Sequence, residues 1–316
     1  MNVLVTGAAG FVGRVLCARL LATTPEAAAR FTFIDRAIGA SADPRLETVS
    51  ADLAAGSPAL ERALAHADTV IHLAAVPGGA AERDYAASRR VNLELSLAML
   101  EQLAARAKPV RFVYASTIAV FGEPLPPAID DGTPALPTMT YGAHKLMVET
   151  ALSDLSRRGA LDGFAVRLPG LLARPPGGGG MKSAFMSELF HAAVARRPFV
   201  VPTGEDATVW IMSVSCAVEN LLHAARLAGG AARPRRAFTL PALRVTMGEL
   251  VRAVARRTGT DPRTFTFERD AALEAQFGRL PPLATPTADA LGFRHDGDLD
   301  SLVARALADA GDGRAP

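Results

Sequence analysis

Cysteine and histidine are scarce in this chain of 316 residues, and their scarcity excludes several kinds of site. The two cysteines, Cys17 and Cys216, lie far apart in apolar stretches, so each is expected to be a buried free thiol. None of the six histidines stands with a cysteine at the spacing of a zinc site. We therefore expect no disulfide and no bound metal.

The chain also lacks an excess of charge of either sign and a long apolar run. Its 34 basic and 32 acidic residues give a formal net charge of +2, which offers no strong field for nucleic acid or an anionic membrane. No apolar run approaches the roughly 18 residues of a membrane span, and the N-terminus lacks the pattern of a signal peptide. We therefore expect a cytoplasmic protein that binds a small molecule.

Short apolar runs alternate with longer amphipathic stretches through the first 170 residues. The runs expected to be strands are residues 2–7, 31–35, 47–53, 68–75, 110–117 and 163–169. The stretches expected to be helices are residues 11–22, 58–67, 86–107 and 140–159. Because apolar strands separated by helices are typical of a parallel sheet covered on both faces, the pattern predicts an α/β fold with a Rossmann-type doubly wound sheet.

Three glycines, Gly7, Gly10 and Gly13, stand between the first expected strand and helix. Glycine lets a ligand approach the backbone, and the first turn of the helix, with Phe11 and Val12, offers free N–H groups to a pyrophosphate. The G-x-x-G-x-x-G spacing departs from the usual G-x-G-x-x-G fingerprint. A plain connecting turn would also be rich in glycine, so the turn needs support from elsewhere.

That support comes from Asp35, which ends the second strand 22 residues after Gly13. A carboxylate there accepts hydrogen bonds from ribose hydroxyls and repels a 2′-phosphate, which favours NAD over NADP. Arg36 weakens this preference, because an arginine there can bind a 2′-phosphate. Asp52 and Leu53, after the third strand, are placed to flank the adenine.

Tyr141 and Lys145 are four residues apart on an expected helix, so they share one face. A free tyrosine has a pKa near 10, and a nearby ammonium would lower it until the phenol can act as a base near neutral pH. Ser116 and Thr117 both end a strand at the ligand-binding edge of the sheet. Of the two, Thr117 is expected to orient the substrate oxygen. Asn92 is expected to hold a water beside Lys145. A surface pair of tyrosine and lysine is the alternative.

After about residue 170 the alternation of strands and helices becomes irregular. A Pro- and Gly-rich loop is expected over residues 174–180, and Thr246 with Glu249 predicts a capping box at the start of a helix. The predicted division gives residues 1–170, joined by 208–242, to an NAD-binding domain, and residues 171–207 and 243–316 to a smaller mixed substrate-binding domain.

Together, "TGAAGFVG", Asp35, "HLAA" (72–75), Asn92, "YASTIAVFG" (114–122) and "YGAHK" (141–145) resemble the extended short-chain dehydrogenases/reductases. The resemblance implies a Rossmann domain, a nicotinamide cofactor and a catalytic set of Thr117, Tyr141 and Lys145, with threonine where serine is commoner. It also implies that Leu73, Ala74 and Ala75 lie along the cofactor.

Two departures from the nucleotide-sugar members of the family point to a smaller substrate. "VRLPGLLARP" and "TVWIMSVSCAVE" replace segments in which those members carry an asparagine and an arginine-aspartate pair, and a diphosphate needs cationic partners. The longer pattern resembles the sugar-acid dehydrogenases, those acting on D-erythronate in particular. It implies NAD-dependent oxidation of the C2 hydroxyl of a four-carbon sugar acid to a 2-oxo acid. Substrate contacts are expected from Ser116, Thr117, Tyr141, Arg174, Lys182, Ser183 and Thr208.

Two other functions stay open at this point. One is a nucleotide-sugar epimerase or dehydratase that keeps NAD tightly bound. The other is a dinucleotide-sensing regulator, although such proteins commonly lose the tyrosine or the lysine, and this chain has both. The family resemblance also implies a homodimer that pairs two helices, including the one with Tyr141, into a four-helix bundle.

Overall fold

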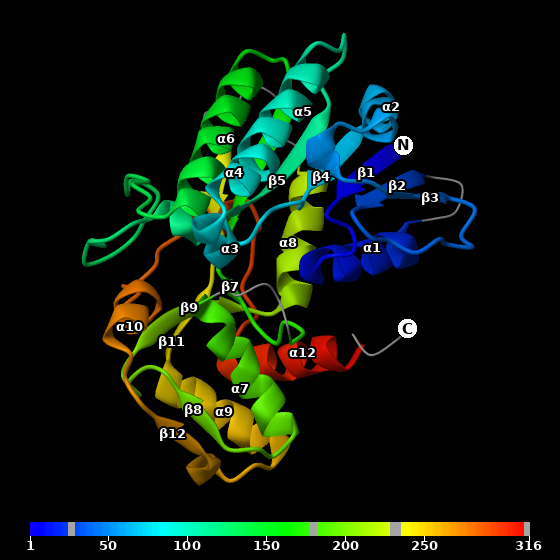
Figure 1. The fold of residues 1–316 in the computed structure, drawn as a ribbon. Helices are drawn as coiled ribbons and strands as arrows, with labels where there is room; N and C mark the ends of the chain where they lie inside the picture. The colour runs from blue at the N-terminus through cyan, green and yellow to red at the C-terminus, as the bar shows by residue number, and fades with distance from the viewer. Residues whose placement is uncertain (25–28, 177–181, 228–234, 313–316) are drawn as a thin grey trace. The chain divides into compact units, whose positions relative to one another are not determined.

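The computed structural model describes all residues except 25–28, 177–181, 228–234 and 313–316, and the chain divides into two compact units (Figure 1). The first unit comprises Met1–Phe121, Ala135–Arg167 and Val218–Thr239, and the second comprises Gly122–Pro134, Leu168–Ala217 and Leu240–Pro316. The second unit thus takes residues 122–134 and 208–217, which the sequence pattern left with the first. The functional roles of the two parts stay a prediction. Most of the expected 174–180 loop lies outside the described residues.

The first unit is built on a seven-stranded sheet. In sheet order its strands are β10 (Ala237–Thr239), β6 (Asp162–Leu168), β5 (Arg111–Thr117), β4 (Thr69–His72), β1 (Asn2–Thr6), β2 (Arg30–Asp35) and β3 (Leu46–Ser50). The described registers are parallel, which confirms the predicted Rossmann-type sheet. The chain order reverses between β1 and β4, and in such a sheet ligands bind beyond the carboxyl ends of the strands at that point.

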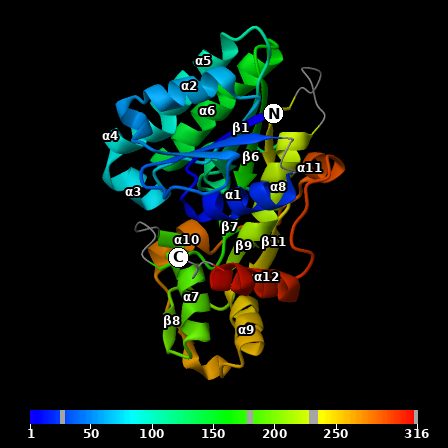
Figure 2. The same cartoon turned by 90° about the vertical axis from the view of Figure 1, so that its right-hand side faces the viewer.

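Helices cover both faces of this sheet. They are α1 (Phe11–Thr23), α2 (Pro58–His66), α5 (Leu95–Ala104), α6 (Thr140–Arg157) and α8 (Val214–Arg226). Figure 2 shows α2, α5 and α6 on one face and α1 with α8 on the other. Buried Leu4, Val70 and Phe112 from the strands pack with Met99 of α5 and Leu152 of α6. The helices are therefore held by apolar burial against the sheet.

The single long helix expected over residues 86–107 is observed as three segments. They are α4 (Tyr85–Ser88), a π-helical turn (Arg89–Glu94) and α5, and the short helix α3 (Gly78–Arg83) precedes them. The prediction was therefore right that this stretch is helical and wrong that it forms one regular α-helix. Such π-turns occur mostly as local bulges and frequently at functional sites, and this one carries Asn92.

The second unit has short strands and its own apolar core. A three-stranded sheet joins β11 (Leu243–Thr246), β9 (Thr208–Met212) and β7 (Gly170–Leu171), and a two-stranded one joins β12 (Phe265–Phe267) and β8 (Phe199–Val201). Its helices are α7 (Phe185–Val194), α9 (Met247–Thr258), α10 (Ala271–Phe277), α11 (Pro286–Ala290) and α12 (Leu299–Asp312). The predicted capping box at Thr246 and Glu249 is confirmed at the start of α9.

Both cysteines are buried thiols, as expected. Burial raises the pKa of the Cys17 thiol, and the nearby Asp35 raises it further. In the described part of the chain, no helix is both long enough and apolar enough to cross a membrane.

Candidate active site

The glycine turn joins β1 to α1 in a tight, preformed shape. Gly7 has φ of +73°, and a Cβ there would lie 2.6 Å from the backbone N of Ala74. A Cβ on Gly13 would lie 2.1 Å from the carbonyl oxygen of Gly7. The turn therefore needs glycine for its own geometry at these two positions. It also brings the chain after β4, where Leu73 and Ala75 flank Ala74, directly against the turn.

The N-terminus of α1 is left without a side-chain cap. Its N-cap residue, Gly10, is exposed and makes no capping hydrogen bond. The first-turn N–H groups of a helix have no partner within the helix, and Val12 and Gly13 stand in that turn. An anion could accept hydrogen bonds from these groups.

Asp35 lies at the end of β2, beside this turn. One of its carboxylate oxygens accepts a hydrogen bond from the Ala9 N–H at 2.9 Å, and the other accepts one from the Arg36 N–H at 2.7 Å. These bonds fix the carboxylate and leave lone pairs for further donors. Arg36 is exposed, and Asp52 accepts the Ala54 N–H beside the buried Leu53.

The end of β5 carries Thr117, and the first turns of α6, which packs against this strand, carry Tyr141 and Lys145. Lys145 donates from Nζ to the Ala115 carbonyl at 2.7 Å, and Nζ lies 5.6 Å from the centroid of the Tyr141 ring. The Thr117 hydroxyl accepts a hydrogen bond from the Ala119 N–H at 3.1 Å, which leaves its own proton to donate. Tyr141 and Lys145 therefore lie on one face of α6, as their spacing predicted, and the catalytic roles of the three residues stay a prediction.

Close backbone packing seats α6 against this strand end. A Cβ on Gly142 would lie 2.0 Å from the Ala119 carbonyl oxygen, and one on Gly78 would lie 3.9 Å from Cβ and Cδ1 of Tyr141. Any larger residue at Gly142 would push the helix away from Ala119. The glycine after Tyr141 thus sets the distance between the tyrosine and the strand.

Lys145 is almost completely buried, with 1% of its surface exposed. Burial lowers the pKa of its ammonium to about 7, and the negative charge of Glu149 opposes this shift. Nζ also lies 4.4 Å from the centroid of the Tyr114 ring, which is a favourable place for a cation. The alternative of an exposed surface pair is therefore wrong for Lys145.

Asn92 is buried, and its side-chain amide is used to hold backbone. Its Oδ1 accepts the Val76 N–H at 2.7 Å, and its Nδ2 donates to the Val76 carbonyl at 2.9 Å and to Ser88 Oγ at 3.1 Å. This side chain anchors the chain after β4 to the π-helical turn. A role in holding water beside Lys145 stays a prediction, and the amide has few sites left for it.

Two histidines near the site are accounted for by packing. His72 is fully buried between Thr6 at 2.6 Å and Ser96 at 2.9 Å, and burial lowers its pKa to about 3. It is therefore a neutral core residue, as expected. His144, predicted to be a surface or supporting residue, is buried against Ser88 at 3.0 Å. Burial also lowers the pKa of His144, and Arg89 adds to the effect.

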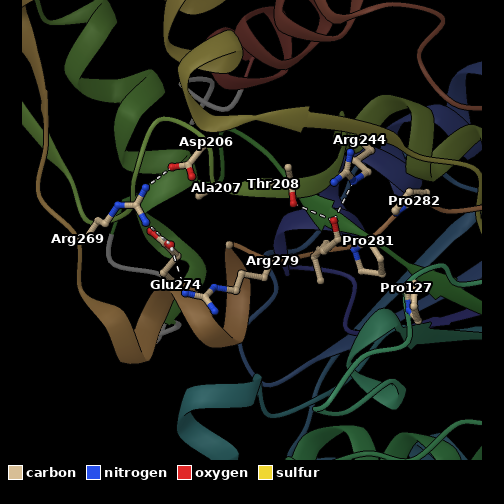
Figure 3. A pocket seen from close by; sticks show the side chains of 12 residues that line it. Pro127, Asp206, Ala207, Thr208, Arg244, Arg269, Glu274, Arg279, Pro281 and Pro282 are labelled. Carbon is tan, nitrogen blue, oxygen red and sulfur yellow. Dashed lines mark hydrogen bonds and ion pairs between the residues drawn. The ribbon is translucent and has the colours of Figure 1, made fainter.

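The expected substrate residues of the second unit are only partly drawn together. Thr208 donates to the Leu280 carbonyl at 2.8 Å and lines a cavity of about 460 Å³ (Figure 3). Arg244, Arg269 and Arg279 also line it, but Arg174 and Ser183 do not. Both of the latter are half-buried, and the Arg174 carbonyl accepts a hydrogen bond from His191. The side chain of Lys182 lies outside the described residues.

Comparison with known proteins places this architecture. The model of the NAD dependent epimerase/dehydratase family matches residues 3–231. The chain belongs to this family. Membership confirms the resemblance to the extended short-chain dehydrogenases/reductases and, because the family is NAD-dependent, the predicted cofactor.

Two curated relatives match this epimerase/dehydratase chain over nearly its whole length. The D-erythronate dehydrogenase of Cupriavidus necator is 35% identical over 98% of this chain and 99% of its own. The D-erythronate dehydrogenase of Haemophilus influenzae is 30% identical over 96% of this chain and 98% of its own.

Solved structures show the same fold. A nucleoside-diphosphate-sugar epimerase from Agrobacterium tumefaciens has a TM-score of 0.89 at 30% identity and covers 99% of this chain and 95% of its own. An L-threonine dehydrogenase from Clostridium difficile has a TM-score of 0.83 at 20% identity, covering 99% and 98%, which shows the fold alone.

The residues of this family member fit the NAD that the family uses. The N-terminus of α1 has no side-chain cap, and its first-turn N–H groups could bind a pyrophosphate. The carboxylate of Asp35, held by Ala9, retains acceptor capacity for ribose hydroxyls. The preference for NAD over NADP depends on Asp35, which repels a 2′-phosphate, and on Arg36, which attracts one.

Two residues that the sequence reasoning missed complete this site. Glu149, buried in α6, accepts hydrogen bonds from Ser116 Oγ at 2.5 Å and from both Nε and a terminal nitrogen of Arg167. Ser116 is buried and its hydroxyl is bonded to Glu149, while a substrate contact from Thr117 stays a prediction. The spacing of Lys145 and Glu149, again four residues, was the available signal for Glu149. No sequence signal pointed to Arg167.

Proposed function

We propose that this chain is an NAD-dependent dehydrogenase that oxidises the C2 hydroxyl of a four-carbon sugar acid such as D-erythronate to the 2-oxo acid. The observation that carries the proposal is the buried Lys145 ammonium one helical turn from Tyr141, with Nζ 5.6 Å from the centroid of the Tyr141 ring. The full-length similarity to two D-erythronate dehydrogenases supports the substrate.

In this reaction the chain's own residues bind an oxygen and move a proton. Thr117 donates a hydrogen bond to the substrate hydroxyl oxygen and orients it. Tyr141, as a phenolate, accepts the proton of that hydroxyl, and the charge of Lys145 stabilises the phenolate. Bound NAD would supply the acceptor for the hydride that leaves the carbon bearing this hydroxyl. Gly7, Gly10, Gly13 and Asp35 would hold the cofactor.

The direct test is formation of NADH, followed by its absorbance, when the purified protein is given NAD and a panel of four-carbon sugar acids. We expect turnover with D-erythronate and much less with its stereoisomers. We also expect NADP to be the poorer cofactor, because Asp35 repels a 2′-phosphate. Absence of turnover with every acid in the panel would overturn the proposed activity.

A nucleotide-sugar epimerase is the second candidate, favoured by the similarity to the Agrobacterium structure. Trp210 speaks against it, because this buried indole, bonded to the Pro281 carbonyl at 2.8 Å, stands in the segment expected to supply a cationic partner. An epimerase would interconvert UDP-sugars with no added NAD and no net reduction of it. That result, without sugar-acid oxidation, would replace the dehydrogenase.

We also infer a homodimer in the cytoplasm, with the first unit binding NAD and the second binding the acid. Met147 on α6 and Tyr85 on α4 are both more than half exposed, at 51% and 58%, which supports association through the face that carries them. Sedimentation should give twice the chain mass of 33.0 kDa. Changing Met147 to Glu should shift the protein toward monomer, and a monomeric parent protein would contradict the inference.

A further inference from the structure

Consecutive residues at the end of β5 are tied to successive turns of α6. The carbonyl of Ala115 accepts Lys145 Nζ at 2.7 Å, and the hydroxyl of Ser116 donates to Glu149 Oε1 at 2.5 Å. Thr117 follows them. Residues four apart lie on the same helix face, so Glu149 continues the face of Tyr141 and Lys145 into the core.

Glu149 is itself held by a buried cation. Arg167 of β6 donates to its carboxylate from Nε at 3.0 and 3.1 Å and from a terminal nitrogen at 2.7 Å. The side chains are only 3% and 11% exposed, and the Arg167 guanidinium lies 5.3 Å from the centroid of the Phe121 ring. A fork-shaped pair of this kind has a fixed geometry. It therefore joins β5, α6 and β6 behind the reacting groups.

We propose that Glu149 is a positioning residue, which keeps Lys145 protonated and fixes the Thr117 end of β5 against α6. The inference rests on the proposed dehydrogenase function, in which Lys145 must carry its charge. Glu149 touches neither the substrate nor the reacting hydroxyls in this assignment. It acts through Lys145 and Ser116.

The surroundings of Lys145 explain why a carboxylate is needed there. Tyr114 of β5 and Tyr141 of α6 present their rings to Nζ, and His72 of β4 is neutral because burial keeps its pKa near 3. Burial favours loss of the Lys145 proton, and the charge of Glu149 is what opposes it. Replacing Glu149 by glutamine would also leave the Arg167 cation unmatched, which disfavours the ammonium further.

The titration of Lys145 can be measured directly, because the chain contains only three lysines, Lys108, Lys145 and Lys182. In protein labelled with [13C]lysine and free of cofactor, the Cε signals report each pKa, and Lys145→Arg assigns the signal of interest. We expect Glu149→Gln to lower the pKa of Lys145 by at least about one unit. The matched control is Asp154→Asn, which removes an exposed carboxylate of the same helix and should leave Lys145 unchanged.

The pH dependence of turnover gives the second readout. In Glu149→Gln the Lys145 ammonium would lose its proton at lower pH. The alkaline limb of the kcat/KM profile should therefore move to lower pH by about the change in the pKa of Lys145. A purely structural role would lower the amount of folded enzyme and leave the limb in place. An unchanged Lys145 titration with an unchanged limb would overturn the proposal.

Glu149→Gln could destabilise the fold by leaving Arg167 unpaired, so the double variant Glu149→Gln/Arg167→Gln is included. It removes both buried charges, and Lys145 should still titrate below its native value. A double variant that folds and titrates as the native protein does would sink the proposal. Should the native enzyme oxidise no sugar acid, the proposed substrate fails, whereas the lysine titration still decides the role of Glu149.

Discussion

The two units each contain an arginine-carboxylate pair, and the pairs differ in how much water reaches them. In the first unit Arg167 and Glu149 are 11% and 3% exposed, whereas in the second unit Arg269 and Asp206 are 54% and 76% exposed (Figure 3). Water screens the exposed pair, so its attraction is offset by solvation and side-chain entropy. The buried pair has no such screening. Similar contacts therefore have different consequences for stability and for the neighbouring lysine.

The largest effect is expected from Tyr141→Phe, which removes the proton acceptor that the buried charges serve. Turnover should fall by about 10²- to 10⁴-fold, the usual contribution of a positioned acid or base. NAD binding, measured by calorimetry, should be nearly unchanged. The control is Tyr85→Phe, because Tyr85 is exposed on α4. Equal loss in both variants, or none in Tyr141→Phe, would show that the phenol is not the base.

Replacing Arg167, the cation of the buried pair, should lower the free energy of unfolding of the protein. Arg167→Gln leaves the Glu149 carboxylate buried with only Ser116 and the more distant Lys145 to stabilise it. Removing one partner of a buried pair costs about 3–5 kcal/mol. Denaturant unfolding would measure this change in the free energy of unfolding. The double variant with Glu149→Gln should lose less than Arg167→Gln alone, and a larger loss would contradict the assignment of the cost to an unpaired charge.

The depressed pKa of Lys145 predicts a specific dependence of stability on pH. Folding lowers this pKa from 10.5 to about 7, so between these values the unfolded chain binds the extra proton. The cost of burying the ammonium is therefore fully present below about pH 7 and is relieved as pH rises. Relative to Lys145→Met, which lacks this proton, the native protein should gain up to about 1.4 kcal/mol for each pH unit above 7.

Denaturant unfolding of both proteins at pH 7, 8 and 9 gives this difference. Other buried groups, such as the thiol of Cys17, are common to both proteins and cancel. A stability difference that stays constant over this interval would show that the lysine is not desolvated in the native state.

The first unit was predictable because its signals are local. The strands β1 to β6 are apolar runs of four to seven residues separated by helices, and the pair Tyr141 and Lys145 follows from helical spacing. The second unit is made of strands as short as β7, with two residues, paired with segments far away in sequence. Such pairings leave no periodicity to detect.

In the candidate site, too, local spacing was predictable and contacts between distant segments were not. Glu149 could have been found from its place four residues after Lys145, since the same rule had already paired Tyr141 with Lys145. Arg167 lies on β6, outside the helix that carries Glu149. Only the packing of β6 beside α6 brings the two side chains together. Asn92 of the π-helical turn is bonded to Val76, which is a tertiary contact. The helical periodicity of the sequence does not reveal tertiary contacts.

The smallest effect is expected from the exposed pair. Asp206→Asn makes the same chemical change as Glu149→Gln, a carboxylate to an amide opposite an arginine, but at a position that is 76% exposed. Its free energy of unfolding should stay within about 0.5 kcal/mol of the native value, and the titration of Lys145 should not move. A loss as large as that of Glu149→Gln would mean that the number of charge pairs, rather than their burial, sets the stability of this protein. High salt separates the two cases again, because it should erase the remaining difference for Asp206→Asn and leave that for Glu149→Gln.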